Sequence, residues 1–288
     1  MIDTVCIIGV GLIGGSLARG LRSKNWCQKV IGIDSNPNAI ETALRLNVID
    51  EGFASIDDCP VVPEIIVVAV PVLKIKEIFK QMSPWIHQCK AVTDVGSTKQ
   101  NVLDAFKEIY ADSPSGNCFV PGHPIAGREC SGVESSVEDL FADRKVILTP
   151  AIDTDADSVN IISEMWQQVD AHVEHLDAKE HDTILAATSH LPHALAYALV
   201  HCLSTQSHTP EIFRYAAGGF ADFTRIASSD PIVWRQICLA NREELLKSIE
   251  HFDTSLQALR SSLLNEDGDA LQKIFSEAKD ARDRYTDC

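Results

Sequence analysis

The feature that most constrains this chain is a group of three glycines at the end of its first apolar run. Residues 4–9 (TVCIIG) form a β-branched run, and the sequence GVGLIG over residues 9–14 leads from it into a helical pattern. At such a strand-to-helix turn, Gly9 permits the tight turn, Gly11 lets a pyrophosphate approach the backbone, and Gly14 allows close helix–strand packing. Free N–H groups at the start of the helix favour phosphate. The segment therefore predicts a dinucleotide-binding loop.

Asp34 ends the second apolar run and lies 20 residues after Gly14. A carboxylate at this place accepts hydrogen bonds from the adenosine ribose hydroxyls and repels a 2′-phosphate, and no basic residue occurs in Ser35-Asn36-Pro37. We therefore predict that the cofactor is NAD and not NADP. A P-loop is excluded because the segment lacks the required lysine, and the alternative is a glycine-rich turn without a ligand. The predicted cofactor-binding residues are Gly9, Gly11, Leu12, Ile13, Gly14, Asp34, Val70, Pro71 and Ser97.

Short apolar runs alternate with helical patterns in the first part of the chain. The runs are continuous and β-branched, as expected of strands that are buried on both faces of a parallel sheet. This alternation predicts a doubly wound α/β sheet of the Rossmann type. The predicted strands are 4–9, 29–34, 65–70, 91–95, 118–120, 145–149 and 171–176, with helices at 12–24, 37–46, 73–82 and 98–110.

Strand patterns end near Asp177, and the rest of the chain is predicted to be helical, over residues 178–203, 210–217, 231–264 and on to the C-terminus. Asp230-Pro231 marks the start of the third helix, as an N-cap carboxylate followed by a proline at the first helical position. We predict an NAD-binding domain over residues 1–177 and an all-helical substrate and dimerisation domain over residues 178–288. A homodimer is expected through an apolar helix face with Leu239, Leu245, Leu246, Ile249, Phe252 and Leu256.

Charge and cysteine content narrow the functional classes. The 288 residues include 25 Lys and Arg against 41 Asp and Glu, which gives a net charge of −16. Such a surface repels nucleic acid and anionic lipid, so we expect neither as a partner, and an anionic substrate needs a local cation. The nine cysteines form no CxxC element, and no apolar stretch approaches the roughly 20 residues of a membrane span. These features favour a cytoplasmic protein with reduced thiols.

Reactive residues follow the ends of the predicted strands. In an open α/β sheet, ligands bind outside the carboxyl ends of the strands, so Pro71, Ser97 and His123 are expected at one edge. His123 lies between Gly122 and Pro124 in a predicted fixed loop, and an imidazole suits removal of a hydroxyl proton during hydride transfer. We predict His123 as the base and Ser97 as a partner of the reacting hydroxyl or of the imidazole. The alternatives are a loop histidine that binds backbone groups and a serine that caps the next helix.

Two segments of the helical half carry candidate substrate-binding residues. SHLPH over residues 189–193 places a proline inside a helical pattern, which predicts a kink that frees backbone groups. A metal bound by His190 and His193 is the alternative to packed or substrate-facing histidines, but no third ligand has a suitable spacing, and we predict no metal. Residues 218–225 (GGFADFTR) are predicted to form a glycine-opened turn. Its Arg225 supplies the cation that clamps a carboxylate, and the alternative is a surface arginine paired with Asp222.

The motifs also resemble those of one known family. The prephenate and arogenate dehydrogenases of tyrosine biosynthesis are similar in GVGLIGGSLA, DVGSTK, GHPIAGRECSGVE, SHLPHALA and GGFADFTRIASSDPIVW, in this order and over nearly the whole chain. The likeness is strongest to the compact bacterial form sometimes called cyclohexadienyl dehydrogenase. The resemblance implies NAD-dependent oxidative decarboxylation of prephenate to 4-hydroxyphenylpyruvate, or of arogenate to tyrosine, by a protein whose helical C-terminal domain dimerises.

The resemblance also implies roles for individual residues. His123 takes the proton of the ring C4 hydroxyl while a hydride leaves C4 for the nicotinamide, and Ser97 orients that hydroxyl. His190 lies in the substrate pocket, and Arg225 binds a substrate carboxylate. Two further residues match positions near the pocket, Asp222 and Trp234.

The chain departs from the family pattern at Arg128 and Cys130, where Ser or Thr and Lys are common. A monofunctional form is expected, without a chorismate-mutase bundle or a regulatory domain. One alternative function is a β-hydroxyacid dehydrogenase of the same two-domain plan, which needs a catalytic lysine where the predicted 178–203 helix has histidines. The other is a non-catalytic NAD-sensing protein, which has no use for His123, Ser97 and Arg225 together.

Overall fold

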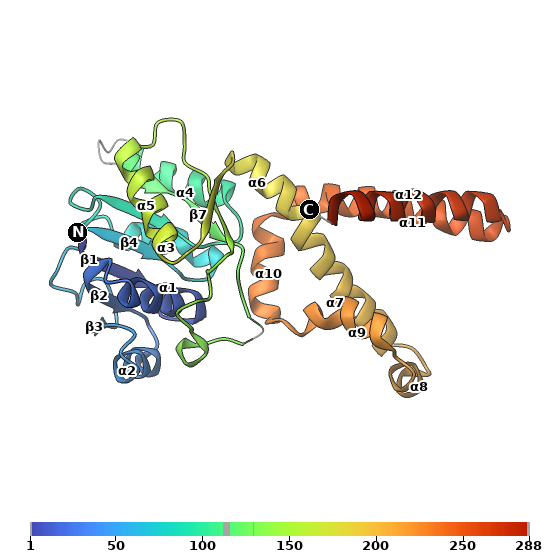
Figure 1. Cartoon of the computed structure of the whole chain (residues 1–288), viewed down its shortest axis with the longest axis horizontal. Coiled ribbons are helices and arrows are strands. Elements are labelled where there is room, and N and C mark those ends of the chain that lie inside the picture. The colour runs from blue at the N-terminus through green and yellow to red at the C-terminus, as the bar shows by residue number, and fades with distance from the viewer. Residues whose placement is uncertain (1, 112–115, 129, 287–288) are drawn as a thin grey trace. The chain divides into compact units, whose positions relative to one another are not determined.

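The computed structural model describes residues 2–111, 116–128 and 130–286. One compact unit ends at Asn241, and a second unit begins at Arg242. The first unit is built on a six-stranded sheet in the order β3-β2-β1-β4-β5-β6 (Figure 1). Its strands are β1 (Ile2–Ile8), β2 (Cys27–Ile33), β3 (Glu51–Phe53), β4 (Ile65–Val68), β5 (Ala91–Asp94) and β6 (Phe119–Val120).

All neighbouring strands of this sheet are parallel. The chain winds from β1 to β2 and β3 on one side, and then returns to place β4 on the other side of β1. The switch in winding direction between β1 and β4 is where such sheets bind ligands, at the carboxyl ends of the strands. The predicted doubly wound sheet is confirmed, although the short strand β3, which contains a glycine, was not predicted. The predicted strands 145–149 and 171–176 do not belong to this sheet, because they pair in a separate one.

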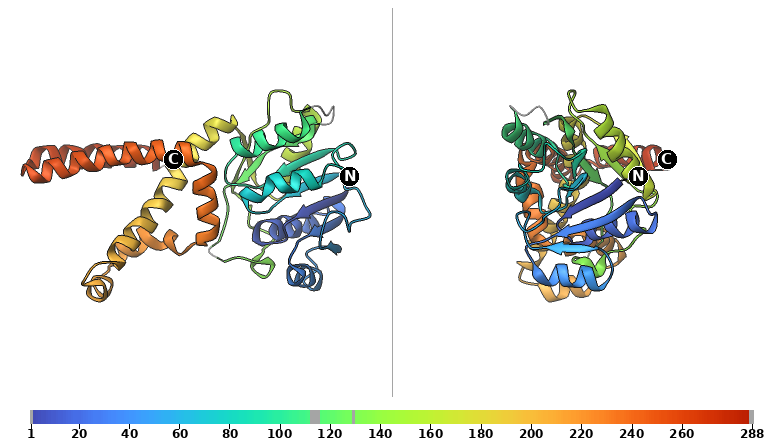
Figure 2. Two further views of the ribbon diagram at one scale, coloured as in Figure 1. Left: turned by 180° about the vertical axis from the view of Figure 1, so that it is seen from behind. Right: turned by 90° about the vertical axis from the view of Figure 1, so that its left-hand side faces the viewer.

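Helices cover both faces of the sheet, as two views show (Figure 1, Figure 2). Alternate residues of β1 divide between the faces, with Val5 and Ile7 in one apolar cluster and Cys6 and Ile8 in the other. The first cluster includes residues of α1 (Leu12–Ser23) and α5 (Ala156–Gln168), and the second includes residues of α3 (Ile75–Gln81) and α4 (Gln100–Tyr110). The remaining helix of this part, α2 (Pro37–Arg45), lies beside β3.

A second sheet has three strands, in the order β7-β8-β9. These are β7 (Gly122–Pro124), β8 (Lys145–Leu148) and β9 (His172–His175). β7 is antiparallel to β8, with His123 opposite Ile147, and β8 is parallel to β9. The prediction that His123 lies in a loop is therefore wrong, because it belongs to a short strand that pairs with β8. The glycine and the proline on either side of His123 are typical of loops and hide this strand in the sequence.

The predicted 178–203 helix is interrupted where the proline predicts a kink. Helix α6 (Ala178–Leu185) leads through a π-helical segment, η4 (Ala186–His190), into α7 (Leu191–Ser204). Pro192 lies in the first turn of α7, directly after the π-helical segment. The predicted change in helix geometry next to the proline is therefore present, as a π-helical turn. The other helical elements of this unit are η1 (Val72–Lys74), η2 (Gly116–Cys118), η3 (Val133–Ser135), α8 (Thr209–Arg214), α9 (Gly218–Thr224), η5 (Arg225–Ser228) and α10 (Pro231–Ala240).

Two predictions for this region are wrong. The glycine-opened segment that was predicted as a turn forms helix α9. The segment over residues 231–264 is not one helix, because α10 ends at Ala240 and the next helix begins at Arg242. Asn241 between them has φ −108° and ψ 34°, and its side chain is bound to α6 and to the π-helical segment. The break between α10 and α11 thus coincides with hydrogen bonds of Asn241 to distant residues, and the spacing of apolar residues in the sequence does not reveal it.

The second unit contains α11 (Arg242–Leu264) and α12 (Gly268–Thr286), which pack against each other. Several large apolar side chains of the predicted dimer face are exposed on α11, namely Leu246, Ile249, Phe252 and Leu256. None of the helices in the described part of the chain has the length and apolar character needed to cross a membrane. The domain boundary near Asp177 stays a prediction.

Candidate active site

The glycine loop between β1 and α1 has the geometry that close packing requires. Gly9 has φ +98°, and a Cβ there would lie 2.4 Å from the carbonyl oxygen of Ala69. A Cβ on Gly14 would lie 2.2 Å from the carbonyl oxygen of Gly9, so α1 approaches β1 this closely only with glycine. A Cβ on Gly11 would meet no described atom within 4 Å. The backbone of Gly11 therefore borders open space that a pyrophosphate fits.

The start of α1 and the carboxylate of Asp34 also fit a dinucleotide. No described side chain caps α1, which leaves the first N–H groups of the helix, from Leu12 and Ile13, for phosphate oxygens. Oδ2 of Asp34 accepts a hydrogen bond from the backbone N–H of Val10 (3.0 Å), and Oδ1 accepts one from Asn36 (2.9 Å). These bonds hold the carboxylate beside the loop, and each oxygen keeps a lone pair for a ribose hydroxyl.

The other predicted cofactor-binding residues lie at the ends of β4 and β5. Cγ1 of Val70 is 3.1 Å from the position of a Cβ on Gly9, and Pro71 follows as the N-cap of η1. Ser97 is half-buried between β5 and α4, and its backbone interacts with the imidazole of His190. The glycine loop and the segment after β4 are therefore together, and Ser97 lies with the histidines.

His123 is held at the end of the main sheet and is almost enclosed. The N–H of Gly122 donates a hydrogen bond to Oδ1 of Asp94 (3.2 Å), which ties β7 to the end of β5. The side chain of His123 is only 8% exposed, and its Nδ1 lies 2.8 Å from Nε2 of His181. A buried imidazole with a narrow access to solvent can exchange a proton with a bound substrate while bulk water is excluded.

His181 and Asp182 of α6 complete this part of the site, and neither was predicted from the sequence. Nδ1 of His181 lies 2.8 Å from Oδ1 of Asp182. The two carboxylate oxygens of Asp182 also accept the backbone N–H groups of Lys99 (2.8 Å) and Gln100 (2.9 Å), at the start of α4. The prediction that Ser97 caps this helix is wrong, because a carboxylate from α6 takes that place. An HD pair at the start of a predicted helix was the only sequence signal.

A second buried group lies in the segment DVGSTK. Nζ of Lys99 donates hydrogen bonds to Oδ2 of Asp94 (2.5 Å) and to the carbonyl oxygen of Gly122 (2.6 Å). Burial raises the pKa of Asp94 and lowers that of Lys99, while the attraction between the two charges opposes both shifts. Neither residue was predicted to have a role, although Asp94 lies near the end of the predicted strand 91–95 and Lys99 follows that strand.

The tautomer of His190 follows from its contact with Asn241. Nδ2 of Asn241 lies 2.8 Å from the carbonyl oxygen of Asp182, which only accepts, so this amide atom is the donor. The same nitrogen lies 3.1 Å from Nδ1 of His190, which must therefore be the acceptor. The neutral ring carries its proton on Nε2, a buried atom without a hydrogen-bond partner in the described part of the chain. Nε2 of His190 is thus the N–H donor of this ring.

His193 and Trp234 form the next layer. Their rings stack with centroids 3.5 Å apart, and Nδ1 of His193 donates to the carbonyl oxygen of Ser189 (3.0 Å). The centroids of Trp234 and His190 are 6.3 Å apart, so the predicted residues Trp234 and His190 are together. Arg225 acts electrostatically on His193, which places its guanidinium in the same region. Asp222 and Arg225 are both exposed, at the end of α9 and the start of η5.

Three histidines of the site, His123, His190 and His193, have lowered pKa values. Burial lowers the pKa of His123 well below its ordinary value, and His181, Lys99 and His190 lower it further. Burial is also the main reason that the pKa of His190 falls to about 4, against the opposing attraction of Asp182. Burial lowers the pKa of His193 as well. At neutral pH, His123 therefore has a free lone pair and can act as a base.

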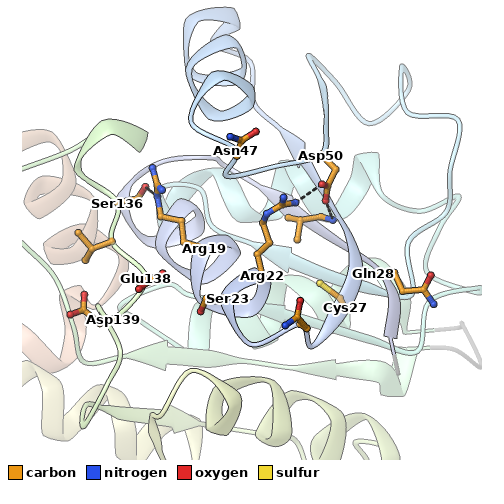
Figure 3. Close-up of a pocket in the computed structure, with 13 residues that line it drawn as sticks. Arg19, Arg22, Ser23, Cys27, Gln28, Asn47, Asp50, Ser136, Glu138 and Asp139 are labelled. Atoms are coloured by element: carbon orange, nitrogen blue, oxygen red, sulfur yellow. Dashed lines mark hydrogen bonds and ion pairs between the residues drawn. The ribbon is translucent and has the colours of Figure 1, made fainter.

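Two other features lie outside this arrangement. Among the described residues, no group of three or more His, Cys, Asp or Glu side chains is arranged to hold a metal ion. A surface cavity of about 740 Å³ is lined by α1, β2 and residues 136–139, and Figure 3 shows Arg22 paired with Asp50 in it. Because its lining includes none of the residues discussed above for catalysis or cofactor binding, this cavity is separate from the site.

Of the two positions that depart from the family pattern, Nη1 of Arg128 donates to the carbonyl oxygen of Ser135 (3.4 Å), and Cys130 is exposed. The hydrogen bond of Arg128 does not involve His123.

Two family models match the chain. Residues 17–175 match the nucleotide-binding domain of prephenate dehydrogenase, and residues 177–277 match its dimerization domain. The main sheet is thus followed by a largely helical dimerisation domain.

Individual relatives match nearly the whole chain. The prephenate dehydrogenase of Bacillus subtilis is 37% identical over 287 residues, which cover 98% of this chain and 76% of the relative. The cyclohexadienyl dehydrogenase of Zymomonas mobilis is 35% identical over 283 residues, which cover 96% of this chain and 94% of the relative. A crystal structure of prephenate dehydrogenase from A. aeolicus with hydroxyphenyl propionate and NAD+ has a TM-score of 0.91 and 41% identity, covering 99% of this chain and 98% of that one. This chain therefore belongs to the prephenate dehydrogenase family.

Proposed function

We propose that this protein catalyses the NAD-dependent oxidative decarboxylation of prephenate to 4-hydroxyphenylpyruvate, or of arogenate to tyrosine. The observation that carries the proposal is the buried, neutral imidazole of His123, in a strand that is tied to the end of the sheet whose glycine loop fits NAD. The names of the relatives and the ligands in the A. aeolicus complex support the same reaction. Loss of carbon dioxide makes the ring aromatic, so the overall step is strongly favourable.

The base in this reaction is His123. Its Nε2 takes the proton of the ring C4 hydroxyl and returns it to the phenolate oxygen after the carboxylate has left as carbon dioxide. NAD, when bound, accepts the hydride from C4. Exclusion of water around His123 keeps the imidazole neutral until substrate is present. The task of the protein is to align the ring and to remove one proton at the right atom.

The remaining residues hold the substrate. Ser97 orients the C4 hydroxyl, and the N–H at Nε2 of His190 donates to an oxygen of the substrate. Arg225 binds a carboxylate, as a guanidinium fits this group in a bidentate manner. Trp234 supports the pocket through its stack on His193. Asp222 is the remaining residue proposed to bind the substrate.

We infer that the protein is a homodimer through the helical domain of residues 178–288, with the NAD-binding domain over residues 1–177. The dimerization-domain match and the exposed apolar residues of α11 support this assembly. A cytoplasmic location suits a chain that uses NAD and whose described cysteines are free thiols.

The test is the formation of NADH, followed by its absorbance, when prephenate or arogenate is added with NAD or NADP. We expect turnover with NAD well above that with NADP, because Asp34 repels a 2′-phosphate. The Arg225→Gln variant should raise KM more than it lowers kcat, because it removes a contact that the substrate already makes before reaction. Lack of turnover with both substrates would refute the proposal. The ratio of kcat/KM for the two substrates assigns the preference.

A further inference from the structure

A continuous chain of hydrogen bonds runs from a carboxylate of α6 to His123. Oδ1 of Asp182 lies 2.8 Å from Nδ1 of His181, and Nε2 of His181 lies 2.8 Å from Nδ1 of His123. The three side chains are 4%, 0% and 8% exposed, so bulk water does not compete for these contacts. Chains of this kind are strengthened by the low polarity around them.

The direction of each bond follows from Asp182. Its Oδ1 also accepts the N–H of Lys99, and its Oδ2 accepts the N–H of Gln100. An ionised carboxylate satisfies all of these donors and has no proton to give. Nδ1 of His181 must therefore donate to Asp182.

The position of the proton on His123 follows from the lone pair of His181. When His181 carries one proton, on Nδ1, its Nε2 presents a lone pair. Nδ1 of His123 is the atom that meets this lone pair, so it carries the proton and donates. The other ring nitrogen of His123, Nε2, is then unprotonated.

We propose that His181 and Asp182 are positioning residues, which hold His123 in the tautomer whose Nε2 accepts the substrate proton. This inference rests on the proposed role of His123 as the base. The substrate proton moves from the C4 hydroxyl to Nε2 of His123, and no proton needs to pass along the chain. The imidazolium that forms keeps its Nδ1–H bond to His181, behind which lies the negative charge of Asp182.

The charges around His123 make this support necessary. Burial and the neighbours His181, Lys99 and His190 all disfavour a positive imidazole, as the lowered pKa of His123 shows. His181 accepts the Nδ1–H of His123 and is itself bound to the carboxylate of Asp182. This arrangement stabilises the positive imidazole that forms when His123 takes the substrate proton. The carboxylates that oppose the cations belong to Asp94, which binds Lys99, and to Asp182, which binds His181.

The first test is ¹⁵N NMR of histidine-labelled protein without substrate or cofactor, with the signals of His123 assigned by their loss in His123→Asn. At neutral pH we expect the proton of His123 on Nδ1 and that of His181 on Nδ1. A His123 proton on Nε2 would overturn the inference. This measurement does not depend on turnover, so it can fail while the proposed reaction stands.

The second test compares two substitutions of His181. Gln places an amide oxygen near the position of Nε2, where it can still accept from Nδ1 of His123, whereas Leu removes the acceptor. We expect His181→Leu to lower kcat by about 10²-fold and to populate both tautomers of His123, and His181→Gln to retain most of kcat and the Nδ1–H tautomer. His175→Leu, at an exposed histidine of β9, is the control and should change neither.

The third test addresses the carboxylate. Asp182→Asn leaves one oxygen for the donors, and an amide N–H turned toward His181 reverses the chain and moves the proton of His123 to Nε2. The matched control is Asp177→Asn, which alters the exposed N-cap of the same helix, where Oδ1 accepts from Lys179 and Glu180. We expect Asp182→Asn to lower kcat with little change in KM, and Asp177→Asn to do neither.

These tests distinguish the role of His123 as the base from the positioning role of His181 and Asp182. If His123→Asn turns over normally, the proposed base is wrong, whatever the tautomers are. If His123→Asn is inactive but His181→Leu keeps both the wild-type kcat and the wild-type tautomer, the positioning role is wrong and the proposed function stands.

Discussion

Lys99 and Asp94 form an ion pair from which solvent is excluded, with Nζ 2.5 Å from Oδ2 and both side chains fully buried. The pair also binds both backbone groups of Gly122, the residue before His123. Nζ of Lys99 donates to the carbonyl oxygen of Gly122, and Oδ1 of Asp94 accepts the N–H of Gly122. The two charges therefore fix the strand that carries the proposed base. The same ion pair therefore contributes to the stability of the fold and to the position of His123.

We predict that Lys99→Met costs about 3–5 kcal/mol in the free energy of unfolding, because it leaves the carboxylate of Asp94 buried without its partner. Urea denaturation measures this loss. The double variant Lys99→Met/Asp94→Leu removes both charges and should lose less than the single variant. Lys76→Met is the control, since Lys76 forms an exposed ion pair with Glu108 and should be nearly silent. Equal losses for Lys76→Met and Lys99→Met would contradict the prediction.

Two alanine substitutions in the glycine loop should separate folding from cofactor binding. In Gly14→Ala the new methyl would lie 2.2 Å from the carbonyl oxygen of Gly9, and such overpacking costs about 1–3 kcal/mol or more. Gly11→Ala meets no described atom within 4 Å, and φ −95° with ψ −153° suits alanine, so stability should be unchanged.

The same methyl at Gly11 enters the space that a pyrophosphate needs, so we expect NAD affinity to fall by at least about tenfold. Thermal unfolding and NADH fluorescence titration measure the two effects. Wild-type affinity in Gly11→Ala would show that the pyrophosphate does not approach this residue.

The stability of the first unit should decline as the pH falls below about 6.5, the ordinary pKa of histidine. The folded protein resists protonation of His190 until its pKa of about 4, whereas the unfolded chain binds the proton earlier. The unfolded state therefore holds more protons in this interval, and acid favours unfolding. His190 alone accounts for a loss of about 3 kcal/mol between these pH values, and the lowered pKa of His123 acts in the same direction.

Urea denaturation over this pH range checks the sign. His190→Gln should show a shallower dependence on pH than the wild type, whereas His172→Gln, at an exposed position, should follow the wild type. Stability that rises as the pH falls through this interval would be the opposite of our expectation.

Much of the fold follows from local patterns in the sequence. Buried parallel strands need continuous apolar runs, and a helix start that meets phosphate needs glycine, so the loop of Gly9 and the carboxylate of Asp34 are visible without coordinates. Pro192 likewise shows where a helix must change its geometry. The chain order of strands also brought His123 to the correct edge of the sheet.

The features that were missed depend on contacts between distant residues. His181 and Asp182 look like polar residues on an ordinary helix start until the fold places them against Lys99 and His123. Asn241 ends a helix while its side chain binds groups that are 51 and 59 residues away in sequence. No apolar period records such contacts, because they depend on hydrogen-bond partners and not on burial of apolar surface.

The most direct test of the account is the His123→Asn variant, assayed for NAD binding by titration and for turnover with prephenate in the same preparation. We predict NAD affinity close to that of the wild type and a kcat lower by about 10²–10⁴, as for removal of a general base. A variant that binds NAD and turns over prephenate at the wild-type rate would contradict the assignment of His123 as the base.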